Sequence, residues 1–269
     1  MNIALLTSSH LRHKYIAAKI AESLNLALVV SEEKNTAITD TTLYNEADKK
    51  LINTHFDDRS KSEKQFFGDY SIFPREVELI RVLNKDVNSK EVQEALVKHK
   101  IDVILLFGSS IIKDDLLVKY PEKIINLHLG LSPYYKGSGT NFFPIVNNEF
   151  ECIGATFHLA SNKVDAGNLL HQIRVKGVNE NDTIYSLGNK VIKEAGKIYP
   201  KIVMEYLMGE ITPKAQKSVV HGNVYRIKDF TPQSIRNAKA VIQKGGLKYY
   251  LDNKTQIDNS KPIFLSYNG

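Results

Sequence analysis

The sequence predicts an α/β fold of the Rossmann-like, doubly wound type, with a mostly parallel sheet and a small C-terminal appendage. Short apolar runs alternate with segments of helical periodicity along most of the chain. The run at residues 101–107 is almost continuously apolar, which is typical of a strand buried on both faces of a parallel sheet. From residue 209 onward the chain is richer in Lys, Gln, Asn and turn residues, which indicates a separate element.

The first part of the chain predicts strands and helices in alternation. Residues 3–6 form a short apolar strand, and residues 12–24 place apolar side chains on one helical face. Residues 26–30 predict a second buried strand. Residues 89–99 predict a helix with Ser89 as its N-cap, and this helix leads into the strand at 101–107.

The same alternation continues to the middle of the chain. Residues 112–120 predict a short helix that stops before Pro121, and residues 123–127 predict another strand. Two further strands are expected at residues 153–159 and 169–175. These elements complete the predicted sheet.

Three features predict the domain organisation. A long helix is expected after a cap at residues 181–183, and Pro200 should kink it or end it early. We expect a domain at residues 1–208 and a small extension at 209–269. The polar stretch 53–73 is long for a connector and is either helical or a mobile lid.

The composition is that of a globular protein. Of 269 residues, 42% are hydrophobic and 25% are charged, which excludes disordered and fibrous classes. The net charge of +6 would suit phosphate-bearing partners, but no basic cluster longer than a pair stands out, so a solvated surface explains it as well.

The lone Cys152 excludes an internal disulfide and is expected to be a small core residue. Without a signal peptide or an apolar run of membrane-spanning length, we expect a cytoplasmic protein with no membrane partner.

Polar side chains at the ends of predicted strands are the first candidates for chemistry, because open parallel sheets bind ligands there. Asn126 and His128 are separated by one residue at the end of a strand, so both face the same side. Together with Asp165 they suit acyl transfer without a covalent enzyme nucleophile, since an amide and an imidazole can stabilise an oxyanion while a carboxylate holds the imidazole. Spacing alone allows another interpretation, in which Asn126 caps a turn and His128 is a satisfied core histidine.

Three coupled motifs surround these residues. The segment HLGLSPYYKG at residues 128–137 resembles the signature loop of folate-dependent formyltransferases, which follows an Asn two residues upstream. Downstream, GATFH at 154–158 and VDAGNLLHQ at 164–172 resemble further motifs of that family, in the same order and at similar separations. Gly130 and Ser132 depart from the usual Ser and Leu of the loop, and Asn162-Lys163 stands where acidic and Gly residues are common. The resemblance is detailed over residues 101–172 and loose over 1–208.

This resemblance implies a domain that binds 10-formyltetrahydrofolate and needs no metal. It gives Asn126 and His128 the role of stabilising the oxyanion, while Asp165 orients His128 and relays the proton. The pterin is then expected between the loop at residues 107–111 and the loop at residues 159–165, each of which follows a predicted strand. The residues expected to contact it are Phe107, Gly108, Ser109, Ile111, His158, Leu159, Ala160 and Asp165. For His158, a purely structural role fits its apolar strand equally well.

Two loops are candidates for binding the amine substrate. The loop after the first strand and the glycine-rich loop 137–141 could each bind phosphate through backbone amides, or simply cap the helix that follows. The aromatic residues between 134 and 143 would suit stacking on a sugar or a base. The residues expected to contact the substrate are Ser8, Ser9, His10, Tyr135, Lys136, Gly137 and Asn141.

Among formyltransferases, the short tail and modified signature loop favour enzymes that formylate amino sugars carried on nucleotides. Initiator-tRNA enzymes carry a larger basic C-terminal barrel, but the lysines and arginines of the tail leave tRNA open. Purine-pathway glycinamide ribonucleotide enzymes have a glycine-rich first loop that this chain lacks. A formyltetrahydrofolate hydrolase and a non-catalytic binding module are further alternatives, and pairing of two chains through the tail is also left open.

Overall fold

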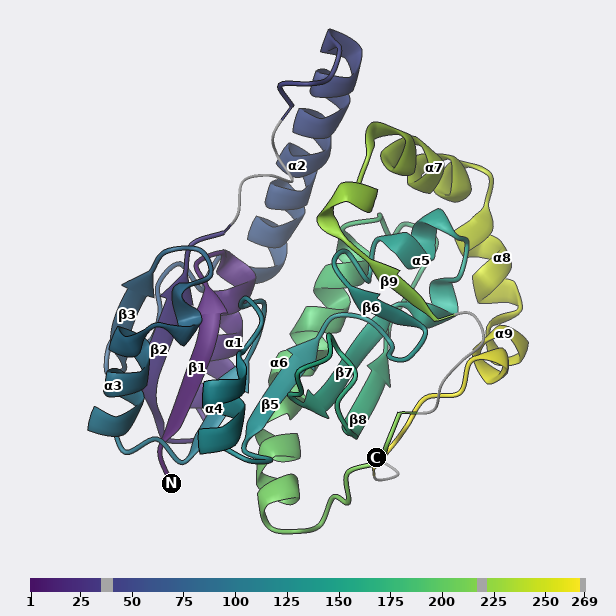
Figure 1. The fold of residues 1–269 in the computed structure, drawn as a ribbon. Helices are drawn as coiled ribbons and strands as arrows, with labels where there is room; N and C mark the ends of the chain where they lie inside the picture. The colour runs from purple at the N-terminus through teal and green to yellow at the C-terminus, as the bar shows by residue number, and fades with distance from the viewer. Residues whose placement is uncertain (35–40, 217–221, 267–269) are drawn as a thin grey trace.

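The computed structural model describes residues 1–34, 41–216 and 222–266 (Figure 1). Its main sheet has seven strands in the order β3-β2-β1-β4-β5-β7-β8. The first five of these are parallel, and β7 and β8 run antiparallel to their neighbours. The strands are β1 (Ile3–Ser8), β2 (Leu26–Glu32), β3 (Glu78–Val82), β4 (Val103–Leu106), β5 (Ile124–His128), β7 (Gly154–Leu159) and β8 (Leu169–Arg174). The predicted α/β class and the mostly parallel sheet are therefore confirmed.

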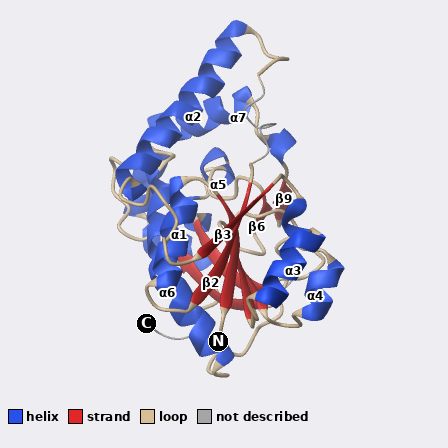
Figure 2. Cartoon of the chain, turned by 90° about the vertical axis from the view of Figure 1, so that its left-hand side faces the viewer, coloured by secondary structure: helices blue, strands red, loops and turns tan. Residues whose placement is uncertain are grey.

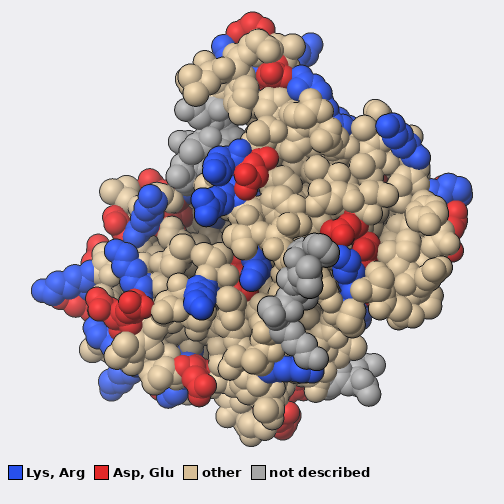
Figure 3. Space-filling model, turned by 45° about the vertical axis from the view of Figure 1, so that its right-hand side comes forward, with Lys and Arg blue, Asp and Glu red and all other residues tan. Residues whose placement is uncertain are grey.

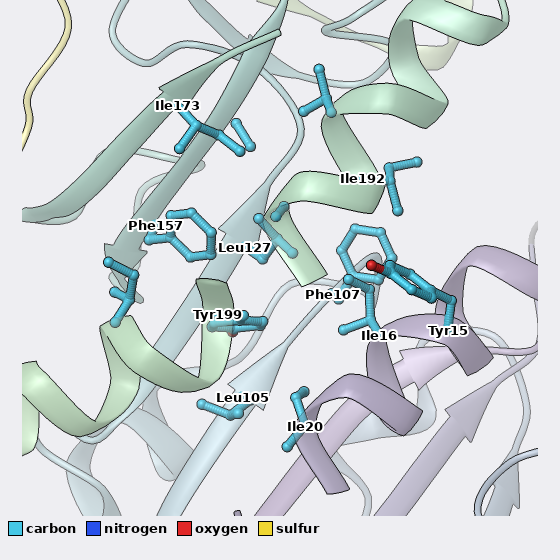
Figure 4. Close-up of a cluster of buried hydrophobic side chains, with 14 of the residues drawn as sticks. Tyr15, Ile16, Ile20, Leu105, Phe107, Leu127, Phe157, Ile173, Ile192 and Tyr199 are labelled. Carbon is cyan, nitrogen blue, oxygen red and sulfur yellow. The ribbon is translucent and has the colours of Figure 1, made fainter. Parts of the chain in front are cut away.

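Helices cover both faces of the sheet (Figure 2). On one face lie α1 (Leu11–Ala21) and α6 (Ser186–Leu207), and on the other lie α3 (Lys90–Lys98) and α4 (Asp114–Lys119). The larger core fills the space between the sheet and the α1–α6 pair, where Tyr199 of α6 packs near Phe157 of β7 (Figure 4). Burial of this apolar surface is the main force that holds the layers together.

The helix ends follow the sequence only in part. The predicted cap at Ser89 is confirmed, because its Oγ accepts a hydrogen bond from the backbone N of Val92, 3.3 Å away. The long helix α6 begins only at Ser186, where the Thr183 hydroxyl accepts from the Ser186 backbone N at 3.0 Å. The expected early end at Pro200 is wrong, since α6 continues past this residue to Leu207.

Of the polar stretch 53–73, predicted as a helix or a lid, residues 53–67 belong to a 22-residue helix, α2 (Glu46–Phe67), and residues 68–73 follow it outside regular structure. Asn45 caps it by accepting from the backbone N of Asp48 at 2.9 Å. The helix projects beyond the sheet and runs beside α7 (Pro232–Gln243) (Figure 1). An ion pair between Arg236 of α7 and Asp48 of α2 joins the two helices.

The chain after the long helix packs back onto the middle of the chain. The short strands β6 (Tyr135–Gly137) and β9 (Asn223–Tyr225) pair in parallel, and α7 contacts α5 (Phe143–Val146). The remaining short elements are η2 (Asp86–Asn88), η3 (Phe150–Cys152), η4 (Ile227–Asp229), α8 (Gly246–Asp252) and α9 (Lys254–Ser260). Cys152 is fully buried as a small core residue, as predicted. Over the described ranges, no helix has the length and apolar character required to cross a membrane.

Candidate active site

The candidate site lies where the parallel part of the sheet meets the antiparallel part. Asn126 and His128 stand at the C-terminal end of β5, and His158 stands near the end of β7. In the register of the two strands Asn126 lies directly opposite His158. The loop after β7 carries Asp165 back across these strand ends.

The structure brings the three predicted residues together around the Asp165 carboxylate. His128 Nδ1 is 3.2 Å from Asp165 Oδ2, and Asn126 Nδ2 donates to Asp165 Oδ1 at 3.3 Å. The backbone N of Gly137, in the signature loop, donates to Oδ2 at 2.9 Å. One carboxylate thus fixes an amide, an imidazole and the loop at the same time.

His158 also belongs to this group. Its Nδ1 is 2.8 Å from the carbonyl oxygen of Leu159, and its Nε2 is 3.0 Å from Asn126 Nδ2. Because a carbonyl only accepts, Nδ1 carries the proton and Nε2 accepts from Asn126. His158 therefore orients the Asn126 amide, and its side chain is 2% exposed.

Burial and charge oppose each other in the His128–Asp165 pair. Burial acts to raise the pKa of Asp165, but His128, His158 and the Gly137 N–H together hold that pKa well below its usual range. Burial lowers the pKa of His128, and the Asp165 charge acts against this effect. Asp165 is therefore a permanent anion at neutral pH. The second nitrogen of His128 lies 3.0 Å from the carbonyl oxygen of Tyr135, so both ring nitrogens face acceptors.

The backbone around Asp165 is held from two sides. Asp165 has φ of 46°, in the left-handed region that a side-chain-bearing residue rarely adopts. Its carbonyl oxygen accepts from Ser132 Oγ at 3.3 Å and from Gln216 Nε2 at 2.8 Å, and the same Gln216 nitrogen donates to the Gly167 carbonyl at 2.8 Å. Sequence reasoning missed Gln216, because nothing in its local pattern distinguishes it from other polar residues of the tail.

The signature loop is shaped by residues of the other two motifs. Thr156 accepts from the backbone N of Ser132 at 3.0 Å, and Gln172 Nε2 donates to the Ser132 carbonyl at 2.6 Å. Gly130 has φ of 154°, and a Cβ there would lie 2.7 Å from His128 Nε2 and 2.6 Å from Thr140 Cβ. A side chain at position 130, where the family usually has Ser, would therefore be too close to His128, and Gly lets the loop approach this ring.

These side chains open into a cavity of about 920 Å³. Most of the residues predicted to contact folate line it, namely Phe107, Gly108, Ser109, Ile111, His158, Ala160 and Asp165, whereas Leu159 is not among the lining residues. The amide nitrogen of Asn141, also in the lining, is buried and has no hydrogen-bond partner among the described residues. In the same parts of the chain, no three His, Cys, Asp or Glu side chains are grouped so that they could hold a metal ion.

The residues predicted to contact the substrate divide into two groups. Gly137 and Asn141 line the cavity, but Ser8, Ser9, His10, Tyr135 and Lys136 do not. Ser8 is fully buried. Tyr135 is 1% exposed because its ring packs on Phe143 and Cys152 and its hydroxyl donates to Glu149.

The alternative that these loops cap helices by their side chains is wrong. No side chain caps α5, since Thr140 Oγ1 donates to the carbonyl of Leu129 and Asn141 Oδ1 accepts from the backbone N of Gly154 at 2.9 Å. No side chain caps α1 either, and Thr7 Oγ1 donates to the carbonyl of Phe107 at 2.7 Å.

The far end of the cavity is formed by residues that sequence reasoning did not select. Arg12 comes from α1, and His55, Phe56 and Arg59 come from α2. Phe230, which follows η4 in the C-terminal segment, closes this end. The available signal was the spacing of His55, Arg59 and Glu63 by four residues, which places them on one helical face.

Comparisons with known proteins identify the family and the fold of this chain. Residues 1–203 match the family described as formyl transferase. Among solved structures, phosphoribosylglycinamide formyltransferase from Anaplasma phagocytophilum superposes with a TM-score of 0.55 at 19% identity, over 83% of this chain and 96% of that chain. A sugar N-formyltransferase from a Shewanella species gives a TM-score of 0.54 at 19% identity, over 86% and 78% of the two chains. A 4-N formyltransferase from Francisella tularensis gives 0.54 at 20%, over 85% and 77%. At these identities the structures show a common fold, and the family match shows that this chain belongs to the formyl transferase family.

Proposed function

We propose that this chain is an N-formyltransferase that moves a formyl group from 10-formyltetrahydrofolate to a primary amine, most simply that of an amino sugar carried on a nucleotide. The observation that carries the proposal is the Asp165 carboxylate, which holds Asn126 and His128 at the wall of a cavity of about 920 Å³. Such a volume is large enough for two substrates to meet at these side chains.

The residues of the cavity fit a folate carrier. Residues 107–112 and most of the loop 160–165 line the site, and the amide nitrogen of Asn141, which has no partner in the described parts of the chain, offers a donor to a ligand oxygen. When bound, the carrier supplies the activated formyl group. Our proposal for the folate contacts keeps Phe107, Gly108, Ser109, Ile111, His158 and Ala160.

The mechanism follows from the positions of the protein groups. As an amine attacks the formyl carbon, negative charge develops on the formyl oxygen, and N–H donors fixed in advance stabilise it. Asn126 Nδ2 and His128 Nε2 are the donors we propose at this wall. To reach the formyl oxygen, Asn126 Nδ2 gives up its contact with Asp165 or His158, and His128 Nε2 gives up its contact with the Tyr135 carbonyl. The bond between the formyl carbon and the carrier nitrogen then breaks, and the proton that the amine loses goes to that nitrogen, so that tetrahydrofolate leaves and the amide remains on the acceptor. Asp165 is too weak a base to keep a proton, because its pKa is held low, so its part is to orient His128 and to offset positive charge on that ring.

A small-molecule acceptor is favoured over tRNA. The face shown in Figure 3 carries scattered Lys and Arg side chains with acidic residues among them, instead of a continuous basic surface. The cavity itself is walled by α2 and by Phe230 of the C-terminal segment. The shared fold with a sugar N-formyltransferase supports an amino sugar as the acceptor.

The triad variants test this proposal. Asn126→Ala, His128→Ala and Asp165→Ala should each lower formyl transfer by about 100-fold or more, the usual effect of losing an oxyanion donor or an acid–base group. Release of tetrahydrofolate is followed with 10-formyltetrahydrofolate and a panel of nucleotide-linked amino sugars. Asn168→Ala, at an exposed position of the same loop, is the matched control and should react like the wild type.

Other outcomes would reject the proposal in distinct ways. Near-normal turnover in all three variants would show that these residues do not carry the reaction. Transfer to aminoacyl-tRNA alone would assign a different acceptor. Formate release without any acceptor would make the chain a hydrolase.

A further inference from the structure

One end of the cavity carries more cationic than anionic side chains. Arg12, Lys34 and Arg59 line it, and Glu63 is the carboxylate at this end among the described lining residues, while Glu32 acts on Lys34 from outside the lining. Both oxygens of Glu63 are used by Arg12: Oε2 is 2.6 Å from Arg12 Nη1, and Oε1 accepts from the Arg12 backbone N at 3.0 Å. This end of the cavity therefore keeps an excess of positive charge.

Among the three cations at this end of the cavity, Arg59 differs from Arg12 and Lys34 in its contacts. Its guanidinium makes no hydrogen bond or ion pair with any residue in the described ranges 1–34, 41–216 and 222–266. Burial and the neighbouring Arg12 lower the pKa of Arg59 to about 10, so the protein environment disfavours its charge. An unpaired, half-buried guanidinium beside a second cation is unfavourable until an anion joins it.

An aromatic surface lies beside Arg59. Phe56 precedes it by three residues on α2, and the Phe56 ring lies 5.5 Å from the ring of Phe230 in the C-terminal segment. His55 packs on the same ring at 5.2 Å. Flat or ring-shaped groups of a ligand would contact this surface while a charged group reaches Arg59.

We propose that Arg59, with Arg12 and Lys34, binds the diphosphate of the amine substrate, and that Phe56 and Phe230 contact its base or sugar. The inference rests on the proposed function and deepens it, because it names the part of the acceptor that this cavity recognises. Guanidinium groups match phosphate oxygens in geometry, and a diphosphate diester carries one negative charge on each phosphate, which suits the excess positive charge here. Recognition thus comes from side chains of α1, of α2 and of the segment after β2, instead of the backbone amides of the first loop or the glycine-rich loop.

Direct binding measurements test this site without any formyl transfer. Uridine diphosphate, thymidine diphosphate and inorganic diphosphate are titrated by calorimetry into the wild type, Arg59→Gln and Arg59→Lys. We expect Arg59→Gln to weaken diphosphate binding by about tenfold or more, the effect of one lost charge-assisted contact, and Arg59→Lys to weaken it less. Lys61→Gln removes a charge from an exposed position of the same helix and should bind like the wild type. Uridine and thymidine should bind equally to all four proteins.

Two results would overturn the inference. The first is that Arg59→Gln does not weaken diphosphate binding, either because the two proteins bind it equally or because neither binds it at all. The second is a loss of 5-formyltetrahydrofolate binding in Arg59→Gln with diphosphate binding unchanged, which would assign this end of the cavity to the carboxylates of the folate tail. If diphosphate binds through Arg59 but no nucleotide-linked amine is formylated, the proposed function fails while the anion site stands.

Discussion

At the scale of single residues, Asp165 organises the candidate site through both its side chain and its backbone. Its carboxylate contacts Asn126, His128 and the backbone of Gly137, while its backbone adopts a positive φ that costs about 1–2 kcal/mol for a residue with a side chain. The two hydrogen bonds from Gln216 offset this cost, because they hold the carbonyls on both sides of Ala166. A residue beyond the matched family segment 1–203 thus supports the geometry of the site.

Gln216→Ala tests this support. Loss of both hydrogen bonds lets the Asp165 turn relax, and a small misplacement of the carboxylate should lower kcat by about tenfold while KM for the carrier and the amine changes less. Steady-state kinetics with both substrates varied measure the two constants. Gln233→Ala, at an exposed position of α7, is the matched control and should leave both unchanged. An unchanged kcat in Gln216→Ala would show that the turn holds Asp165 unaided.

The site could be predicted from sequence only where its members lie close to strand ends or motifs. The spacing of Asn126 and His128 allows a shared site but does not require one, so their prediction, like that of Asp165, depends on the resemblance to a known family. Gln216 lies 51 residues from Asp165 in the sequence, and no local pattern marks it. Arg59 reaches the cavity from another helix, and its four-residue spacing from Glu63 shows that the two share a helical face but not that this face borders a site. The aromatic ring of Tyr135 predicts a contact with the substrate, but in the structure this ring packs beside Phe143 and Cys152.

At the scale of elements, a glycine sets how closely α1 approaches α6. A Cβ on Gly196 would lie 2.5 Å from Cε1 of Tyr15, closer than atoms in contact can approach. The same tyrosine donates from its hydroxyl to the carbonyl of Lys193 at 2.6 Å, so its ring has little freedom to move away. The contact between the two helices that cover one face of the sheet therefore depends on this glycine.

Gly196→Ala should destabilise the protein by about 1–3 kcal/mol, because overpacking outweighs the better helix propensity of Ala. Gly188→Ala in the same helix is the matched control. A Cβ there has its nearest neighbour 4.0 Å away, at Asn141, so this change should be neutral or stabilise by up to about 1 kcal/mol. Urea unfolding of both variants gives the two free energies. Equal values would show that Tyr15 moves aside without cost.

The elements that sequence predicted best are those whose burial is complete. β1 and β4 are buried along their whole length, so their apolar runs stand out. The edge strand β3 is largely half-buried or exposed and gave no such run. Pro200 stays inside α6 although an internal proline costs about 3 kcal/mol, because packing of this helix against the sheet outweighs the lost hydrogen bond. Apart from Phe56, the residues of α2 that border the cavity are polar, which is why its sequence resembled a connector.

At the scale of the whole molecule, several histidines are buried in their neutral form. His55, on α2, and His171, on β8, are each 4% exposed. Burial, together with nearby lysine or arginine side chains, lowers the pKa of each of them to about 4. In the unfolded chain both rings titrate near 6.5. Between pH 4 and 6.5 the unfolded chain therefore binds more protons at these two rings than the folded chain does.

This difference predicts that the folded protein loses stability already between pH 6.5 and 4, largely above the pH range in which carboxylates titrate. Below pH 6.5 the unfolded chain takes up protons that the folded chain refuses, so the free energy of unfolding falls as the pH falls and levels off only near pH 4. Asp165 acts in a different range, because its lowered pKa contributes stability that is lost only below about pH 4. At pH 5 each of the two histidines should cost about 2 kcal/mol relative to pH 7.5. Urea unfolding at the two pH values measures the loss, and His171→Gln should reduce it by about 2 kcal/mol, the contribution of that one ring. A free energy of unfolding that stays constant from pH 7.5 to 5 would contradict the neutral burial of both rings.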